Sequence, residues 1–236
     1  NYEDVCAAGA GVRMVEQALA TWGRLDALVN NAGVDQHAAF HKIDLETFRH
    51  IFDVNFLGTL QVTHAAWQHM RAAGHGRVLV STSSAGLHGL HGLSAYAASK
   101  AALIGLARTL AAEGASRDLF CNAIAPYAAT RMTEAGITDA AERTAMSPDY
   151  VAPLVSALVS ERDTGLIKRV GATGRDPVVL GAGEGSVPSG EGGLLGLVVP
   201  AGQQHPEPIT GRLAELRRGR QHRPGLLHVL RRCPPA

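Results

Sequence analysis

One stretch of the chain, Leu25-Asp26-Ala27-Leu28-Val29-Asn30-Asn31-Ala32-Gly33, joins a short apolar run to a polar turn. The apolar run ends in a β-branched residue and predicts a buried strand from Leu25 to Val29. The small and amide side chains after it suit a tight turn. A buried strand of this kind is typical of a sheet covered by helices, so the neighbouring segments decide the fold class.

The segment before this strand predicts a helix. Four apolar residues recur at helical spacing and should form one buried face, namely Val12, Val15, Leu19 and Trp22. Gly23 follows the last of them and is expected to end the helix.

The segments after the strand continue the alternation. They predict helices at about 45–73 and 95–114 and strands at 77–80 and 119–124, the last ending at Pro126. Alternating helices and strands are typical of an α/β fold with a doubly wound parallel sheet. Such sheets bind ligands where their strands end, so Asn30, Ser83 and the segment after Pro126 should converge on one crevice.

The composition of the 236-residue chain limits its partners. A formal net charge of +1 gives no reason to expect nucleic acid or an anionic membrane surface. No apolar run is long enough to cross a membrane, and no leader is recognisable. Cys6, Cys121 and Cys233 fit neither a disulfide framework nor a metal site. We expect a soluble, cytoplasmic protein with a small-molecule ligand.

The composition changes toward the end of the chain. Residues 151–236 contain no Phe, Tyr or Trp, and residues 175–236 are rich in glycine, proline and arginine. Such a segment has little apolar surface to offset its ordering entropy. We expect a folded domain at 1–174, followed at 175–236 by a disordered tail or the product of a frameshift.

Tyr96 and Lys100 stand four positions apart at the start of an alanine-rich helix, so their side chains should share one face. A phenol is a poor base at neutral pH, but a nearby ammonium favours the phenolate. Tyr96 could then exchange a proton with a substrate hydroxyl or carbonyl. The alternative is an ordinary helix with a capping tyrosine and a solvated lysine.

Two further polar residues join this pair. Ser83 follows a predicted strand, where its hydroxyl could hydrogen-bond a reacting oxygen or simply cap a helix. Asn55 interrupts an apolar helical stretch, where an amide is costly to bury without a partner. Neither residue means much alone.

The set closely resembles the short-chain dehydrogenase/reductase superfamily. The resemblance rests on five signals in register: Asn30-Asn31-Ala32-Gly33, Asn55, Ser83, Tyr96-x-x-x-Lys100 and Asn122-Ala123-Ile124-Ala125-Pro126. It implies hydride transfer between NAD or NADP and a secondary alcohol or ketone, without a metal.

The resemblance also implies a role for each residue. Tyr96 would be the catalytic acid/base, and Lys100 would lower its pKa and hold the nicotinamide ribose. Ser83 would orient the substrate oxygen, and Asn55 would support a water in the proton relay. The cofactor would contact Tyr96 and Lys100 together with Asn30, Ala32, Gly33, Pro126 and Thr130. The complete protein would be a homodimer or homotetramer.

A narrower resemblance lies in residues 1–5, 61–67, 124–133 and 150–155. These segments are similar to (3R)-hydroxyacyl-CoA dehydrogenases, the group that includes the dehydrogenase domain of peroxisomal multifunctional enzyme type 2 and its bacterial relatives. The similarity implies a 3-hydroxyacyl-CoA substrate and favours NAD. Tyr127 stands where the superfamily usually has glycine, a position at which this group varies.

The glycine-rich turn that binds the pyrophosphate in such enzymes is not found. Gly9-Ala10-Gly11 follows no strand, and Gly181-x-Gly183-x-Gly185 leads into Pro188 rather than a helix. The resemblance places residue 1 near the end of the third strand. We therefore expect only the C-terminal portion of a Rossmann-like sheet, with an open strand edge, poor cofactor binding and little activity in this polypeptide alone.

Two other functions stay open. One is a 3-oxoacyl-carrier-protein reductase, or another ketone reductase, that uses NADPH. Binding to an acyl-CoA affinity matrix would discriminate this reductase from a 3-hydroxyacyl-CoA dehydrogenase. The other is a truncated, non-catalytic assembly protein, which an unaltered function in Tyr96→Phe would favour. His88-x-x-His91 lacks a carboxylate or cysteine at a supporting spacing, so we expect loop histidines and no metal.

Overall fold

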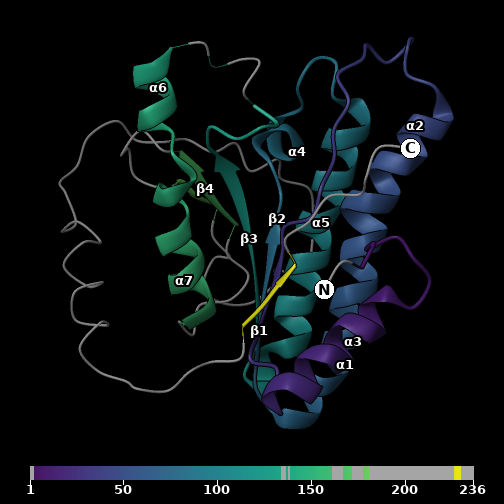
Figure 1. Cartoon of the computed structure of the whole chain (residues 1–236), viewed down its shortest axis with the longest axis vertical. Coiled ribbons are helices and arrows are strands. Elements are labelled where there is room, and N and C mark those ends of the chain that lie inside the picture. The colour runs from purple at the N-terminus through teal and green to yellow at the C-terminus, as the bar shows by residue number, and fades with distance from the viewer. Residues whose placement is uncertain are drawn as a thin grey trace, which may run out of the picture. The chain divides into compact units, whose positions relative to one another are not determined.

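The computed structural model describes residues 3–133, 137 and 139–160, together with the backbone of three strands at 167–171, 178–180 and 226–229. All of them belong to one compact unit. Helices and strands alternate along this part of the chain, as Figure 1 shows.

The described strands form one sheet in the order β5-β4-β3-β2-β1-β6. Its centre consists of β1 (Ala27–Asn30), β2 (Gly76–Ser81) and β3 (Leu119–Tyr127), which pair in parallel. β4 (Ile167–Gly171) runs parallel to β3, and β5 (Val178–Leu180) runs antiparallel to β4. The three central strands confirm the predicted parallel α/β class.

The edge beside β1 is occupied. β6 (Leu226–Val229) runs parallel to β1, with Ala27 opposite Leu226 and Asn30 opposite Val229. The expectation of an open edge at β1 is therefore wrong, because a strand from the C-terminal tail pairs with it. Most of the 175–236 segment lies outside the described residues, so its expected disorder or frameshift stays a prediction.

The stretch predicted as helix at 45–73 is one continuous run of three parts. α2 (Leu45–Phe52) and α3 (Thr59–Ala73) flank a π-helical turn, η1 (Asp53–Gly58), which contains Asn55. The expected interruption of the helix at Asn55 is thus a widened turn. Such turns occur frequently at functional sites.

Helices cover both faces of the sheet. α1 (Ala10–Trp22), α3 and α5 (Ser94–Gly114) lie on one face, and α7 (Ala152–Ser160) lies on the other (Figure 1). The strand residues alternate accordingly, since Leu28 packs into the core of the first face and Val29 into that of the second. The shorter elements are α4 (Ser84–His88), η2 (Ala115–Arg117), α6 (Ala140–Ala145) and η4 (Pro148–Tyr150).

The buried face of α1 differs from the expected one. Val15 is buried, but Val12 and Trp22 are 52% and 51% exposed. The buried residues of the helix are Ala10, Gly11, Met14, Val15 and Ala18. A Cβ at Gly11 would lie 2.4 Å from the carbonyl oxygen of Gln61 in α3, so glycine allows the two backbones to approach this closely.

Two element ends depend on glycine and proline. Gly23 ends α1 as predicted, in a left-handed conformation (φ 71°), with its N–H donating to the carbonyl of Leu19 at 2.8 Å. β3 extends to Tyr127, past Pro126, where the predicted strand ends. Pro126 lies opposite Val170 of β4; a proline is compatible with a strand where its missing N–H is not needed.

Candidate active site

Lys100 is a buried cation. The residue is 4% exposed, and its ammonium donates a hydrogen bond to the carbonyl oxygen of Ser81, the last residue of β2, at 2.8 Å. The Thr82 hydroxyl donates to the carbonyl of Lys100 at 2.7 Å. Burial lowers the pKa of Lys100 from 10.5 to about 8. A lysine with this pKa can change its protonation state near neutral pH.

Tyr96 lies one turn before Lys100 on α5, as its spacing predicts, with the ammonium 5.7 Å from its ring centre. Burial raises the pKa of Tyr96 above 10; a hydrogen bond with the Ser83 side chain opposes this, and the charge of Asp35 adds to it. Burial outweighs the interaction that favours the phenolate. Lys100 is not among the causes of this shift, so its expected effect on the pKa of Tyr96 stays a prediction. Tyr96 is protonated at neutral pH in this structure.

Ser83 has two contacts. It is the N-cap residue of α4, where its Oγ accepts a hydrogen bond from the backbone N–H of Ala85 at 3.1 Å. Its side chain also hydrogen-bonds Tyr96. The cap holds the hydroxyl in place, so the two interpretations of this serine are compatible.

The side chain of Asn55 is completely buried and hydrogen-bonded at both ends. Its Oδ1 accepts from the backbone N–H of Val34 at 2.8 Å, and its Nδ2 donates to the Val34 carbonyl at 2.9 Å. Nδ2 also donates to Oγ of Ser99 at 3.0 Å, and Ser99 donates to the Tyr96 carbonyl at 2.8 Å. Asn55 therefore joins the loop after β1 to the helix that carries Tyr96.

Sequence reasoning misses two residues of this site. Ser99 precedes Lys100 in an alanine-rich helix, but a serine in a helix is too common to be a signal by itself. Asp35 follows the turn after β1, and only tertiary packing brings its charge to Tyr96.

Gly33 leaves space beside the buried polar groups. A Cβ at this position would lie 3.2 Å from Oδ1 of Asn55 and 3.3 Å from Nζ of Lys100. A side chain would cover both groups, whereas glycine lets another molecule approach them. With Tyr96 and Lys100, this cradle fits the nicotinamide half of NAD or NADP. The neighbouring Ala32 belongs to the core beneath the cradle and is 9% exposed.

Asn30 ends β1 and is 3% exposed. Its Nδ2 donates to Oγ1 of Thr63 in α3 at 2.9 Å, so the amide is anchored to that helix. Its Oδ1 is buried and has no hydrogen-bond partner among the described residues. The next residue, Asn31, accepts a hydrogen bond from the Ser81 hydroxyl at 2.7 Å. A direct contact between Asn30 and a cofactor stays a prediction.

The segment after β3 supplies the other predicted cofactor contacts. Pro126 is half-buried near the end of β3, and Thr130 is exposed. The backbone N–H of Thr130 donates to Oγ1 of Thr133 at 2.8 Å, and its own Oγ1 accepts from the N–H of Met132 at 3.3 Å. These bonds form a local turn, and the cofactor contacts of Pro126 and Thr130 stay predictions.

Two further findings concern the described part of the chain. It contains no group of three or more His, Cys, Asp or Glu side chains that could hold a metal ion. None of its helices has the length and apolar character needed to cross a membrane.

A parallel sheet with helices on both faces, and with buried polar side chains where its strands end, defines the class of Rossmann-like α/β folds. The sequence profile of the short chain dehydrogenases matches residues 3–141, more than half of the chain. The chain therefore belongs to the short-chain dehydrogenase family, whose members use NAD or NADP.

Two relatives show the extent of the similarity. The mouse peroxisomal multifunctional enzyme type 2 is 41% identical over 174 residues, which cover 73% of this chain and 23% of that enzyme. The acetoacetyl-CoA reductase of Paracoccus denitrificans is 40% identical over 133 residues, covering 56% of this chain and 53% of the reductase. The chain thus spans less than two thirds of the length of either relative.

A solved structure agrees with this assignment. The full-length peroxisomal multifunctional enzyme type 2 from Drosophila melanogaster superimposes with a TM-score of 0.63 at 30% identity, covering 79% of this chain and 32% of that one. The likeness confirms the Rossmann-like fold and the predicted family resemblance.

Proposed function

We propose that this chain carries the catalytic half of an NAD(P)-dependent dehydrogenase that interconverts a secondary alcohol and a ketone. The observation that carries the proposal is the buried ammonium of Lys100, which lies 5.7 Å from the ring centre of Tyr96, together with the hydrogen bond by which Ser83 acts on the same tyrosine. A phenol in contact with a second hydroxyl and a cation is suited to proton exchange with a substrate oxygen.

Each residue has a distinct role in this proposal. In alcohol oxidation, Tyr96 accepts the proton of the substrate hydroxyl, which Ser83 orients through a hydrogen bond. Lys100 supplies positive charge to the phenolate and holds the nicotinamide ribose, and Asn55 fixes the loop after β1 against α5. The nicotinamide, when bound, supplies the hydride acceptor or donor. In ketone reduction, Tyr96 gives its proton to the carbonyl oxygen.

The electrostatics of the site favour reduction near neutral pH. The pKa of Tyr96 is raised, chiefly by burial, so the phenol carries its proton at pH 7. A protonated phenol is ready to donate to a ketone oxygen, whereas oxidation requires the phenolate. The rate of oxidation is therefore expected to rise with pH into the alkaline range.

The proposed substrate is a 3-hydroxyacyl or 3-oxoacyl group carried as a coenzyme A thioester, with NAD as the favoured cofactor. A relative that is 40% identical is an acetoacetyl-CoA reductase, which supports a 3-oxo thioester. The competing substrate is the same acyl group on a carrier protein, with NADPH.

The test is the reduction of acetoacetyl-CoA by the chain with NADH or NADPH, followed through the nicotinamide absorbance. Little activity is expected from this polypeptide alone, so the ratios of rates between substrates, cofactors and variants carry the test rather than the absolute rate. We expect turnover with acetoacetyl-CoA that exceeds turnover with acetoacetyl-carrier protein, and faster turnover with NADH than with NADPH. Tyr96→Phe should reduce the rate by about 100-fold or more, because it removes the proton donor.

The matched control is Tyr150→Phe, which removes the same hydroxyl from a tyrosine that is 58% exposed in η4. This variant should keep the wild-type rate. Equal rates for Tyr96→Phe and wild type would contradict the proposed function and favour a non-catalytic role of the fold.

A further inference from the structure

The side-chain nitrogen of Lys100 has a neutral hydrogen-bond partner. It donates to the carbonyl oxygen of Ser81 at 2.8 Å, and no carboxylate among the described residues forms an ion pair with it. The titratable side chain that faces it is Tyr96, whose ring centre lies 5.7 Å away. Burial lowers the pKa of Lys100 to about 8. Without its extra proton, the amine keeps an N–H for the Ser81 carbonyl and has a lone pair free for another molecule.

Gly33 lies directly against this amine. A Cβ at Gly33 would lie 3.3 Å from Nζ of Lys100 and 3.2 Å from Oδ1 of Asn55, so glycine keeps side-chain atoms away from both. The glycine is held in place, because the side chain of Asn55 binds the N–H and the carbonyl of Val34, the next residue. Lys100 is 4% exposed, so its amine is buried beneath a residue that has no side chain.

We propose that Lys100 is also an acylation site, whose amine takes an acyl group from a coenzyme A thioester that enters the cradle beside Gly33. The inference rests on the proposed function for its choice of thioester. The amine attacks the carbonyl carbon, a C–N bond forms and the C–S bond breaks; the thiol leaves with the proton that the nitrogen loses. The product is a neutral amide, so an acylated chain lacks the cation beside Tyr96 and loses its activity.

Lys42 provides a control within the same chain, which has lysines at positions 42, 100 and 168. Lys42 is exposed, so accessibility alone favours its acylation over that of Lys100. Nucleophilic reactivity favours Lys100, because an ammonium has no lone pair and desolvation makes the uncharged amine more abundant. The ratio of the two acylation rates therefore shows which of the two causes decides.

The experiment incubates the whole chain with acetyl-CoA, without a nicotinamide cofactor, and follows the acetylation of each lysine by peptide mass spectrometry. Acetyl-CoA has no 3-oxo group, so the measurement does not depend on reduction. We expect Lys100 to be acetylated at least about tenfold faster than Lys42. The rate at Lys100 should rise with pH to about 8 and level off above it, because the amine is then unprotonated. Reduction of acetoacetyl-CoA should fall in proportion to the acetylated fraction of Lys100.

Gly33→Ala tests the route by which the thioester reaches the amine. The added Cβ, 3.3 Å from Nζ, should slow the acetylation of Lys100 by about tenfold and leave that of Lys42 unchanged. The matched control is Gly105→Ala, the same change on the helix that carries Lys100, where a Cβ would meet nothing within 4 Å. This control should change neither rate.

The outcomes separate this inference from the proposed function. Acetylation of Lys100 that is no faster than that of Lys42 overturns the acylation site and leaves the dehydrogenase intact; this wild-type comparison decides even if Gly33→Ala does not fold. Equal rates at Lys100 in folded Gly33→Ala and Gly105→Ala overturn the route through the cradle. Selective acetylation of Lys100, with equal reduction rates for Tyr96→Phe and wild type, supports the acylation site and overturns the dehydrogenase.

Discussion

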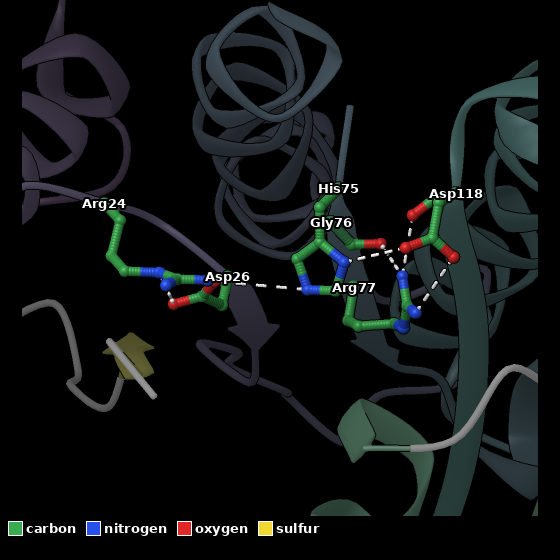
Figure 2. Close-up of polar contacts among 6 residues, drawn as sticks. All are labelled: Arg24, Asp26, His75, Gly76, Arg77 and Asp118. Atoms are coloured by element: carbon green, nitrogen blue, oxygen red, sulfur yellow. Dashed lines mark hydrogen bonds and ion pairs between the residues drawn. The ribbon is translucent and has the colours of Figure 1, made fainter. Parts of the chain in front are cut away.

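Two polar clusters lie at opposite ends of the same three strands. The cluster where β1, β2 and β3 end contains Lys100, held by the carbonyl of Ser81. The cluster where these strands begin is shown in Figure 2, and it joins Arg24, Asp26, His75, Gly76, Arg77 and Asp118. Each cluster contains a buried cation, but the two cations have different hydrogen-bond partners.

The cluster at the strand beginnings pairs opposite charges. Arg77, whose side chain is 6% exposed, donates to the carbonyl of Asp118 at 2.7 Å and to its carboxylate at 3.2 Å. His75 hydrogen-bonds the same carboxylate at 2.8 Å and lies 4.0 Å from Asp26, which pairs with Arg24. Asp26, His75 and Asp118 each immediately precede one strand, so the contacts connect neighbouring strand ends (Figure 2).

The two clusters differ in whether the buried cation stabilises the fold or has a protonation state that can change. A buried cation that pairs with a carboxylate keeps its charge and costs stability when one partner is removed. A buried cation held only by a neutral carbonyl is penalised by desolvation, so its protonation state can be tuned. Four variants can break or sharpen this contrast.

The largest expected effect is the loss of activity in Lys100→Met. Removal of the ammonium from beside Tyr96 should reduce acetoacetyl-CoA turnover by about 100-fold or more. The free energy of unfolding at pH 7 should not fall, because a desolvated charge is replaced by an apolar side chain of similar size. Turnover and denaturant unfolding measured on the same preparation check both points; a large loss of stability would make Lys100 a structural residue.

The second effect is a rise in stability with pH. The pKa of Lys100 is about 8 in the folded chain, and its usual value of 10.5 applies to the unfolded chain. Between these values the unfolded chain binds more protons than the folded chain, so stability rises with pH. Between pH 8 and pH 10.5, the free energy of unfolding of the wild type should rise by at most roughly 3 kcal/mol relative to that of Lys100→Met, at about 1.36 kcal/mol per pKa unit. Parallel curves for the two proteins would show that the lysine titrates normally.

The third effect tests the opposite cluster. Arg77→Met should destabilise the fold by about 2 kcal/mol, because Asp118 loses both its ion pair and a hydrogen bond to its carbonyl. Activity at a temperature where the variant is folded should stay within about twofold of wild type, about 0.4 kcal/mol. The control is Arg24→Met: its side chain is 67% exposed, so the change should cost much less stability than Arg77→Met. Equal losses for both arginines would contradict the distinction by burial.

The smallest expected effect is on the stability of the fold at acid pH. The His75 hydrogen bond, followed by the charge of Arg77, holds the pKa of Asp118 below its usual 3.8. This contribution is present above pH 3.8 and is lost as pH falls through the lower folded value. Asp118→Asn should remove less than about 1 kcal/mol at pH 7 and flatten the acid limb, since the carboxyl is 36% exposed and Arg77 keeps its hydrogen bond to the backbone carbonyl of residue 118. Asparagine also tolerates the φ of 52° at this position, so backbone strain does not confuse the result.

Local patterns predict the three central strands and the helices α1, α2, α3 and α5, but not β4, β5, α4, α6 or α7. The helix and strand periods place the ends of the three central strands within about three residues of the observed ends, and element ends are the least certain part of such a prediction. The face of α1 is predicted wrongly, because its packing depends on the approach of Gly11 to Gln61, fifty positions away. β6 is not predicted, since a four-residue strand in a glycine- and arginine-rich segment has no periodicity that distinguishes it.

In the candidate site too, the sequence predicts some contacts and only the tertiary structure reveals others. The spacing of Tyr96 and Lys100 predicts their contact, because four residues make one helical turn. The bond between Asn55 and Ser99 spans 44 positions, and no local rule connects them. The charge of Asp35 acts on Tyr96 from a loop that the side chain of Asn55 holds at Val34.

The sequence by itself determined the family, the alternation of helices and strands, and the residues able to exchange a proton, because these depend on residue type and short spacing. Tertiary structure alone decided how charged those residues are. Burial lowers the pKa of Lys100 and is the largest cause that raises the pKa of Tyr96, and neither shift follows from the residues next to them in the sequence. Desolvation depends on everything packed around a group, which no stretch of chain specifies in isolation.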